Sequence, residues 1–242
     1  MRNRNIIIIS IALNFLTLLY IVKKFYIKYQ TKPYPRTENL VVKEPKIKYF
    51  LNRDELFENL PIESNSVIFL GNSLTQNFEI SEFFHDLKIK NRGINGDVIP
   101  GIIKRINPII KAEPKKIFLE IGINDLGRGE LKDNVVFNYK KLIDIIRLRL
   151  PNTELYVQSI FPTELYSEDL PIYCTKNVNK DVVKVNDELL KYASVKKYHF
   201  IDTYRYFEKN GCLNKDYSVD GVHLNSKGYK LWAKVLKPYI DQ

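Results

Sequence analysis

Short apolar runs alternate with longer amphipathic segments over most of this chain. The runs are rich in β-branched and aromatic residues, which is typical of buried strands. They cover residues 66–70, roughly 88–91, 116–121, 154–160 and 198–201. Segments with helical spacing lie near residues 98–111, 134–150, 177–193 and 226–240. This alternation predicts parallel strands joined by crossover helices, and therefore a three-layer α/β/α sandwich with a mostly five-stranded parallel sheet.

A longer apolar run lies near the N-terminus. Residues 6–22 include only three polar side chains, and basic residues flank the run on both sides. As a helix the run is about 26 Å long, which is close to the thickness of about 30 Å of the hydrocarbon core of a bilayer. This N-terminal hydrophobic helix is either a cleaved signal peptide or an uncleaved membrane anchor. Bulky residues follow the run where a cleavage site would need small ones, which favours the anchor.

The chain divides into three regions. Residues 1–28 are the predicted membrane anchor or signal sequence, and residues 29–50 contain three prolines and are predicted to form a semi-extended linker. Residues 51–242 are the predicted folded domain, which begins with a short amphipathic helix near Leu51. We expect a membrane-anchored or exported protein with a periplasmic or extracellular domain, although basic residues on both sides of the apolar run leave its orientation open.

The positive charge of the chain is concentrated in its N-terminal part. The formal net charge is +10, of which residues 1–50 contribute +8 and residues 51–242 only +2. The predicted folded domain is therefore nearly neutral, which argues against a nucleic-acid partner. The two cysteines, Cys174 and Cys212, are too few for a disulfide framework. They are either two ordinary thiols or, in an exported domain, a disulfide pair.

Four polar motifs follow strands, at the positions where ligands bind to open parallel sheets. The motifs are GNSLT at 71–75, NRGINGD at 91–97, GIND at 122–125 and DGVHLN at 220–225. Each motif alone has an ordinary structural explanation, because a serine at a strand end is commonly a helix N-cap and Asp-Gly or Asn-Asp pairs commonly form turns. Their joint occurrence in this order is more specific. We expect the four loops to converge on one edge of the sheet.

These motifs resemble the four conserved blocks of the SGNH hydrolase superfamily, which includes the GDSL-type esterases. The resemblance covers residues 64–240 and implies a flavodoxin-like fold and the hydrolysis of esters. The first motif departs from the family pattern, because Asn72 stands where the name GDSL implies an aspartate. We expect this change to alter one local hydrogen bond and to leave activity in place.

The resemblance implies that Ser73 is the nucleophile, His223 the base and Asp220 the carboxylate that orients the base. It also implies an oxyanion hole made of the backbone N–H groups of Ser73 and Gly96 and the side-chain amide of Asn124. These residue types suit the chemistry. A serine hydroxyl needs a base within about 2.6–3.2 Å, an imidazole can take its proton near neutral pH, and an aspartate in the same loop can fix the imidazole tautomer.

Other classes of enzyme have no matching motif in this sequence. The G-x-S-x-G elbow of α/β-hydrolases, the phosphate-binding G-x-x-x-x-G-K-[ST] and the dinucleotide motif G-x-G-x-x-G are all absent. His85 and His199 have no ligand-like spacing with each other or with the cysteines, so we expect neither a metal nor another cofactor. We expect Asp97 to cap the helix that follows it and Asp125 to support its own loop.

The longest irregular stretch of the folded domain is residues 161–177, which follow the fourth strand and should overhang the site. The stretch is polar, contains tyrosines and has no long apolar run. This favours a small acyl group, such as acetyl, on a hydrophilic alcohol, so we predict a serine esterase that acts on a small ester or an O-acetylated glycan. A lysophospholipase or thioesterase for longer acyl chains is the alternative enzyme. A glycan-binding accessory protein is the non-catalytic alternative, against which the complete set of site residues argues.

Overall fold

The computed structural model describes residues 44–85 and 88–241, with side chains from Lys48 onward. Residues 47–242 form one compact unit, which contains the folded domain. The apolar run 6–22 and the predicted linker up to residue 43 lie outside the described residues. Among the helices that are described, none is both long enough and apolar enough to cross a membrane.

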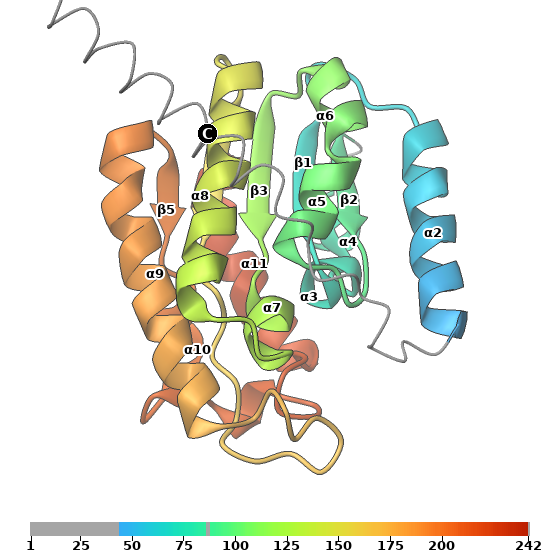
Figure 1. Cartoon of the computed structure of the whole chain (residues 1–242). Coiled ribbons are helices and arrows are strands. Elements are labelled where there is room, and N and C mark those ends of the chain that lie inside the picture. The colour runs from blue at the N-terminus through green and yellow to red at the C-terminus, as the bar shows by residue number, and fades with distance from the viewer. Residues whose placement is uncertain (1–43, 86–87, 242) are drawn as a thin grey trace, which may run out of the picture. The chain divides into compact units, whose positions relative to one another are not determined.

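The domain contains a five-stranded parallel sheet, as the alternating pattern predicts (Figure 1). The order across the sheet is β2-β1-β3-β4-β5, which is the order of flavodoxin-like folds. A separate antiparallel pair, β6 and β7, follows the fifth strand. The strands are β1 (Val67–Gly71), β2 (Ile89–Gly93), β3 (Lys116–Glu120), β4 (Glu154–Gln158), β5 (His199–Ile201), β6 (Glu208–Lys209) and β7 (Cys212–Leu213).

Helices connect the strands and form both outer layers of the sandwich. The long helices are α2 (Glu44–Asn59), α8 (Lys132–Arg149), α9 (Lys176–Lys196) and α11 (Ser226–Ile240). The last three coincide with segments whose spacing predicts helices. The short helices are α3 (Ser73–Gln76), α4 (Ile80–Phe84), α5 (Ile99–Arg105), α6 (Asn107–Ala112), α7 (Ile123–Gly127) and α10 (Tyr204–Phe207). Of these, only α5 and α6 lie in a segment whose spacing predicts a helix.

The segment near residues 98–111, expected as one helix, forms two. Helices α5 and α6 meet at Ile106. Pro108 accounts for the break, because proline has no N–H to donate to a carbonyl one turn earlier and its ring collides with that carbonyl. In the first turn of α6, where Pro108 lies, a missing N–H costs nothing.

Helix α2 begins at Glu44 rather than near Leu51. The last residues of the stretch predicted as a linker, 29–50, are therefore helical. Pro45 is the second residue of α2, and a proline is tolerated there because the N–H groups of a first turn have no partner within the helix. The proline that suggested an extended spacer is thus compatible with a helix start.

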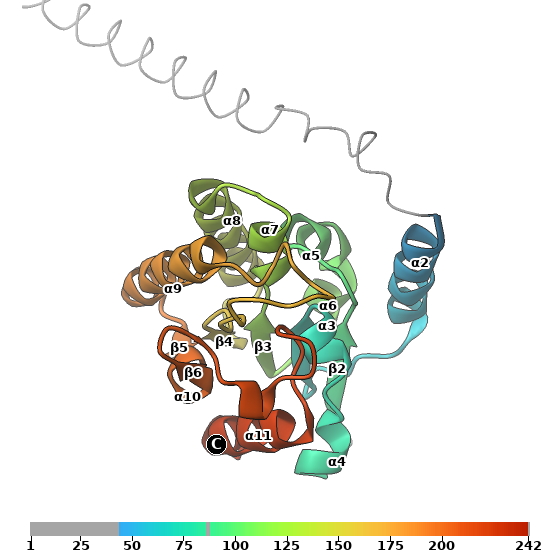
Figure 2. The same cartoon turned by 90° about the horizontal axis from the view of Figure 1, so that it is seen from below.

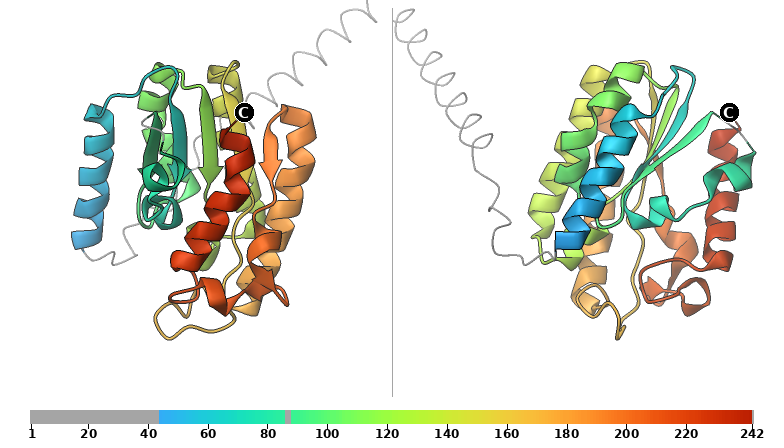
Figure 3. Two further views of the ribbon diagram at one scale, coloured as in Figure 1. Left: turned by 180° about the vertical axis from the view of Figure 1, so that it is seen from behind. Right: turned by 90° about the vertical axis from the view of Figure 1, so that its right-hand side faces the viewer.

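Two hydrophobic clusters hold the helical layers to the sheet, and both layers are visible in Figure 3. Successive strand residues point to opposite faces. Ile68 and Leu70 of β1 therefore join the cluster formed with α5, α6, α8 and α9. Phe69 joins the other cluster, which includes Phe118 of β3 and Trp232 of α11. The rings of Phe69 and Phe118 stack with their centroids 4.9 Å apart.

The carboxyl ends of the five strands lie at one edge of the sheet, which is at the bottom in Figure 1 and faces the viewer in Figure 2. β1 lies between β2 and β3, so the connections after β1 and β2 leave the sheet in opposite directions. Such a switch point opens a crevice at the carboxyl edge, where ligands of parallel sheets bind. The loops after the strands and the loop before α11 meet at this edge (Figure 2).

Glu120, the last residue of β3, is a buried acid in this core. Its side chain is fully buried, and neither carboxylate oxygen has a hydrogen-bond partner among the described residues. Burial raises the pKa of Glu120 to about 8, because a charged carboxylate is disfavoured away from water. The folded protein therefore keeps this proton at neutral pH.

We expect Glu120→Gln to stabilise the protein more strongly as the pH rises. The unfolded chain releases the Glu120 proton near pH 4.5 and the folded protein near pH 8, so the wild type loses stability between these values. The difference in unfolding free energy between variant and wild type should grow by about 3 kcal/mol from pH 5 to pH 8, as measured by urea denaturation. Glu82→Gln, at an exposed position of α4, is the matched control. A difference that stays constant for Glu120→Gln would refute its titration in this range.

Candidate active site

The turn between β1 and α3 carries Ser73 at the carboxyl edge of the sheet. Asn72 caps α3, because its Oδ1 accepts a hydrogen bond from the N–H of Leu74 at 2.8 Å. Ser73 is the first residue of α3 and is largely buried. The Nδ2 group of Asn72 is buried without a partner among the described residues. A neutral amide costs less to bury here than the charged aspartate of the GDSL motif would.

Ser73, His223 and Asp220 form one hydrogen-bonded chain. Ser73 Oγ lies 2.9 Å from His223 Nε2, and Asp220 Oδ2 lies 2.6 Å from Nδ1 of the same ring. The other carboxylate oxygen, Asp220 Oδ1, accepts the N–H groups of Val222 at 3.0 Å and of His223 at 2.8 Å. The fold thus brings together three side chains of which Ser73 and His223 are 150 residues apart.

These hydrogen bonds determine the charge of Asp220. Burial by itself raises the pKa of the Asp220 carboxyl, but the hydrogen bonds from the His223 ring and from two backbone N–H groups outweigh burial and hold the pKa below its usual value. An ionised carboxylate can only accept, so His223 Nδ1 is the donor to Asp220. In the neutral imidazole with this tautomer, Nε2 carries no proton and faces the Ser73 hydroxyl, as a base that takes the serine proton must.

The irregular stretch 161–177 packs on the loop that contains Asp220. Ser167 Oγ donates to the carbonyl of Asp220 at 2.5 Å, and the N–H of Glu164 donates to the carbonyl of Gly221 at 2.8 Å. Gly221 has φ of +92°, and a Cβ at this position would lie 3.1 Å from the Cβ of Ser167. Residues 161–177 therefore fix the backbone of the loop that contains Asp220.

Gly96 and Asn124, the expected donors to an oxyanion, lie at this edge in the loop before α5 and in α7, respectively. Gly96 has φ of +77°, a left-handed conformation that favours glycine. Asn124 is buried in α7, and its Nδ2 donates to the carbonyl of Asp97 at 2.8 Å. A side-chain amide carries two N–H groups, so one remains for a substrate. Arg128 Nη2 donates to the carbonyl of Gly96 at 2.7 Å.

The model of the GDSL-like lipase/acylhydrolase family matches residues 69–231. The chain belongs to this family. It is therefore an ester hydrolase, and the resemblance of the four motifs to the SGNH hydrolase superfamily is confirmed. The hypothesis of a glycan-binding accessory protein without catalysis loses its support.

Three related proteins illustrate the likeness. The hydrolase is 24% identical over 200 residues to an N-acylneuraminate cytidylyltransferase of Streptococcus agalactiae, a match that covers 83% of the hydrolase and 44% of that longer protein. A structure from Streptococcus pneumoniae, described as that of a platelet activating factor, is 28% identical with a TM-score of 0.71, and the match covers 84% of the hydrolase and 95% of that chain. A variant of an acetylxylan esterase from Geobacillus stearothermophilus shares the fold, at 16% identity and a TM-score of 0.58, over 72% of the hydrolase and 94% of that chain.

The motifs of the hydrolase do not reveal a buried ion pair between Arg105 and Asp97. Arg105 Nε donates to Asp97 Oδ2 at 2.8 Å. Its Nη2 donates to the carbonyls of Gly71 and Arg92 at 3.2 and 2.9 Å. The signal available in the sequence is the position of Arg105, one turn after Ile102 on the buried face of a short amphipathic segment. A charged residue on such a face needs a partner.

The expectation that Asp97 caps the following helix is wrong. The N-cap residue of α5 is Val98, which has no side-chain cap, and the Asp97 carboxylate pairs with Arg105 instead. Asp125 does the capping from α7, because its carboxylate oxygens accept the N–H of Ile99 at 3.2 and 3.3 Å. A residue distant in sequence has thus taken the role expected of the neighbour.

The other residues considered in the sequence lie outside this cluster. His85 and His199 are exposed. Cys174 and Cys212 are free thiols, of which Cys174 is buried. In the part of the chain that the structure describes, no group of three or more His, Cys, Asp or Glu side chains is arranged to hold a metal ion.

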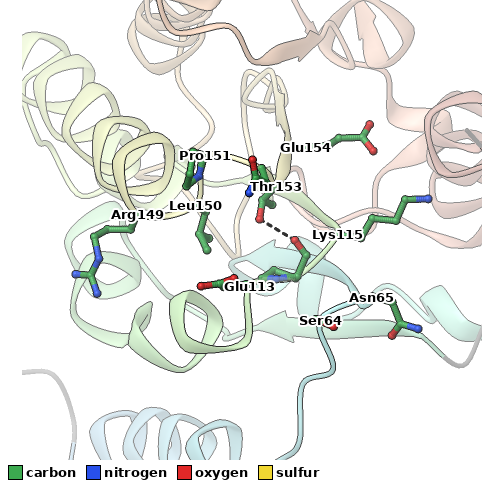
Figure 4. Close-up of a pocket in the computed structure, with 11 residues that line it drawn as sticks. Ser64, Asn65, Glu113, Lys115, Arg149, Leu150, Pro151, Thr153 and Glu154 are labelled. Atoms are coloured by element: carbon green, nitrogen blue, oxygen red, sulfur yellow. Dashed lines mark hydrogen bonds between the residues drawn. The ribbon is translucent and has the colours of Figure 1, made fainter.

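A hollow of about 560 Å³ lies at the opposite end of the sheet from Ser73 (Figure 4). Lys115 and Glu154, at the amino ends of β3 and β4, line it together with Arg149 at the end of α8. Thr153 Oγ1, on its wall, donates to a backbone carbonyl at 2.7 Å. None of the motif residues lines this hollow, so it is separate from the site that the motifs form.

Ser167→Ala should lower kcat of the hydrolase about tenfold with little change in KM, because losing the hydrogen bond to the carbonyl of Asp220 loosens the backbone that positions the acid and base. The measurement is steady-state hydrolysis of p-nitrophenyl acetate. Ser194→Ala is the matched control, since Ser194 Oγ also donates to a backbone carbonyl but lies exposed on α9. Unchanged kcat in a correctly folded Ser167→Ala variant would contradict this role.

Proposed function

We propose that the hydrolase is a serine esterase with Ser73 as nucleophile, His223 as general base and Asp220 as the carboxylate that orients the base. The observation that carries this proposal is the continuous chain of short contacts, 2.9 Å from Ser73 Oγ to His223 Nε2 and 2.6 Å from His223 Nδ1 to Asp220 Oδ2. Both distances are in the range that proton transfer and tautomer control require.

The reaction begins when Ser73 Oγ attacks the carbonyl carbon of the ester. As the new C–O bond forms, His223 Nε2 takes the hydroxyl proton, and the Asp220 carboxylate stabilises the resulting imidazolium. The tetrahedral intermediate then loses the alcohol, which leaves with the proton from His223 Nε2. The acyl group remains on Ser73 as an ester.

The negative charge on the carbonyl oxygen is stabilised by the backbone N–H groups of Ser73 and Gly96 and by Asn124 Nδ2. The N–H of Ser73 belongs to the first turn of α3, where backbone donors have no partner within the helix. In the second half of the reaction, His223 takes a proton from water, the hydroxide attacks the acyl group, and the proton returns to Ser73 Oγ as the acid leaves.

The proposed substrate is a small acyl ester of a carbohydrate, with acetyl as the preferred acyl group. The names of two related proteins support a carbohydrate. One is an acetylxylan esterase, and the other, more than half of which lies outside the match, is named for N-acylneuraminate, a sugar acid. The polar composition of residues 161–177, which pack on the loop of Asp220, agrees with a hydrophilic alcohol.

One observation favours the alternative, a lysophospholipase or thioesterase for longer acyl chains. Leu165, Tyr166 and Ile172 are 56, 71 and 57% exposed, and all three belong to the stretch that packs on the loop of Asp220. Exposed apolar side chains gathered near a site commonly contact an apolar ligand. These side chains would suit an acyl chain that extends from Ser73.

Ser73→Ala should lower hydrolysis of p-nitrophenyl acetate by more than about 10³-fold, because the variant has no nucleophile. Asn124→Ala should lower kcat by about 10²–10³ with little change in KM, since the lost donor acts in the transition state. Ser81→Ala, at an exposed position of α4, serves as the control. Activity near the wild-type level in Ser73→Ala would exclude this serine as the nucleophile.

Among p-nitrophenyl esters, kcat/KM should be highest for acetate and should fall as the acyl chain lengthens, and O-acetylated sugars should release acetate. A preference for chains of about eight or more carbons would reject the acetylesterase and support the alternative, because each buried methylene adds about 0.8 kcal/mol. In that case Leu165→Ser and Ile172→Ser should reduce activity on long chains more than on acetate. Leu148→Ser, at an exposed position at the other end of the sheet, is the matched control.

A further inference from the structure

Arg128 lies beside the proposed oxyanion hole. It directly follows α7, which carries Asn124, and its Nη2 donates to the carbonyl of Gly96 at 2.7 Å. The same nitrogen lies 3.1 Å from the point that a Cβ of Gly96 would occupy. The guanidinium therefore lies against Gly96, the residue whose N–H we assign to the oxyanion.

Most donors of this guanidinium are unused. An arginine side chain carries five N–H groups in a planar fork, and Arg128 is exposed. Within the described part of the chain, the Arg128 side chain bonds to the carbonyl of Gly96, and no carboxylate lies within ion-pair distance of it. One nitrogen of the guanidinium, Nη2, is thus bonded to the protein, and the N–H groups of the other nitrogens can donate to a ligand.

Two acids, Glu130 and Asp125, lie within three residues of Arg128, and neither forms an ion pair with it. Glu130 Oε1 instead accepts the N–H of Leu131 at 3.1 Å and Nδ2 of Asn134 at 2.7 Å. The carboxylate oxygens of Asp125 accept the N–H of Ile99 on α5. Burial raises the pKa of Asp125 to about 7, so this carboxyl is only partly ionised near neutral pH. A large part of the positive charge of Arg128 is therefore available to a ligand.

A reacting substrate extends past this charge. An ester oxygen that accepts the N–H of Gly96 lies about 3 Å from that nitrogen. Covalent geometry and the hydrogen bond to the carbonyl of Gly96 then place Arg128 Nη2 no more than about 9 Å from the ester. A substituent on the sugar ring that carries the ester can span this distance.

We propose that Arg128 is a specificity-determining residue that binds a carboxylate on the alcohol part of the substrate, so that the preferred substrate is an O-acylated sugar acid. The inference rests on the proposed esterase function. An arginine fork matches both oxygens of a carboxylate, and its single charge matches that of one carboxylate. The carboxylate belongs to the alcohol part because an acetyl group has no position for it.

The test compares two substrates that differ by one charge, a mono-O-acetylated hexuronic acid and the uronamide of the same acetylated sugar. Acetate release by the full-length wild type should show a kcat/KM about tenfold higher for the acid, the value of a modest charge-assisted contact. Because salt screens exposed charges, the ratio should fall as salt is raised. The ratio between substrates cancels any general loss of activity in a variant.

Arg128→Gln should bring this ratio close to one, and Arg128→Lys, which keeps the charge but not the fork, should give an intermediate ratio. Arg149→Gln should leave the ratio at the wild-type value, because Arg149 is an exposed arginine in the hollow at the other end of the sheet (Figure 4). These variants separate the effect of one guanidinium from a change in net charge.

A wild-type ratio near one, or a ratio that persists in Arg128→Gln, overturns the inference and leaves the esterase proposal intact, provided that both sugars are hydrolysed in a Ser73-dependent manner. Failure to hydrolyse either sugar also overturns the inference. Hydrolysis of p-nitrophenyl acetate by wild type and Ser73→Ala then decides whether the proposed function fails with it.

Discussion

The buried ion pair between Arg105 and Asp97 holds three segments of the active site in register. Arg105 also donates to the carbonyls of Gly71 and Arg92, at the ends of β1 and β2, and the carbonyl of Asp97 accepts the side-chain amide of Asn124. Both charged side chains are almost completely buried. Removing one partner of such a pair typically costs about 3–5 kcal/mol, because the remaining charge stays buried without compensation. The turn that carries Ser73, the proposed nucleophile, and the segments that carry the proposed oxyanion donors Gly96 and Asn124 depend on this contact.

The acid–base part of the site depends on different contacts. Asp220 and His223 are three residues apart, so contacts within their own loop determine the orientation of the His223 ring relative to the Asp220 carboxylate. The position of this loop relative to Ser73 depends on tertiary contacts: Ser167 donates to the carbonyl of Asp220, and Tyr229, on the helix after the loop, donates to the carbonyl of Leu74 on α3. The two parts meet in the hydrogen bond between Ser73 and His223. Because reaction rates fall steeply when reacting groups are misplaced by about 1 Å, each part must be fixed independently.

Sequence reasoning succeeded where the determinants are local. Buried parallel strands are continuous apolar runs, and three of the four motifs lie at or directly after the ends of β1, β2 and β3, so their convergence follows from the geometry of the sheet. The fourth motif, at 220–225, lies before α11 and reaches the same edge through tertiary packing. Sequence reasoning failed where a residue distant in sequence determines the contact. Asp97, for example, pairs with Arg105 and does not cap the adjacent helix. The contact of Ser167 with Asp220 joins residues 53 positions apart and has no periodic signature. The break at Pro108 is a different case. A proline and its missing N–H can be recognised in the sequence, but the amphipathic pattern on both sides of Pro108 favours one continuous helix.

Reaction chemistry and substrate choice depend on different parts of this structure. The side chains proposed to exchange protons, Ser73 and His223, lie within hydrogen-bond distance of each other, so their arrangement is the same for every ester. An acetyl group extends only slightly beyond Ser73, so the alcohol part of an acetyl ester makes nearly all other contacts. In the alternative proposal of a longer acyl chain, contact with the exposed side chains of Leu165 and Ile172 would add binding free energy in small steps, one methylene at a time. In the proposed binding of a sugar acid, Arg128, which is held at the carbonyl of Gly96, would distinguish a charged alcohol from a neutral one in a single contact. With the proposed acetyl ester as substrate, the selectivity would therefore come from the charge of the alcohol rather than from the length of the acyl chain.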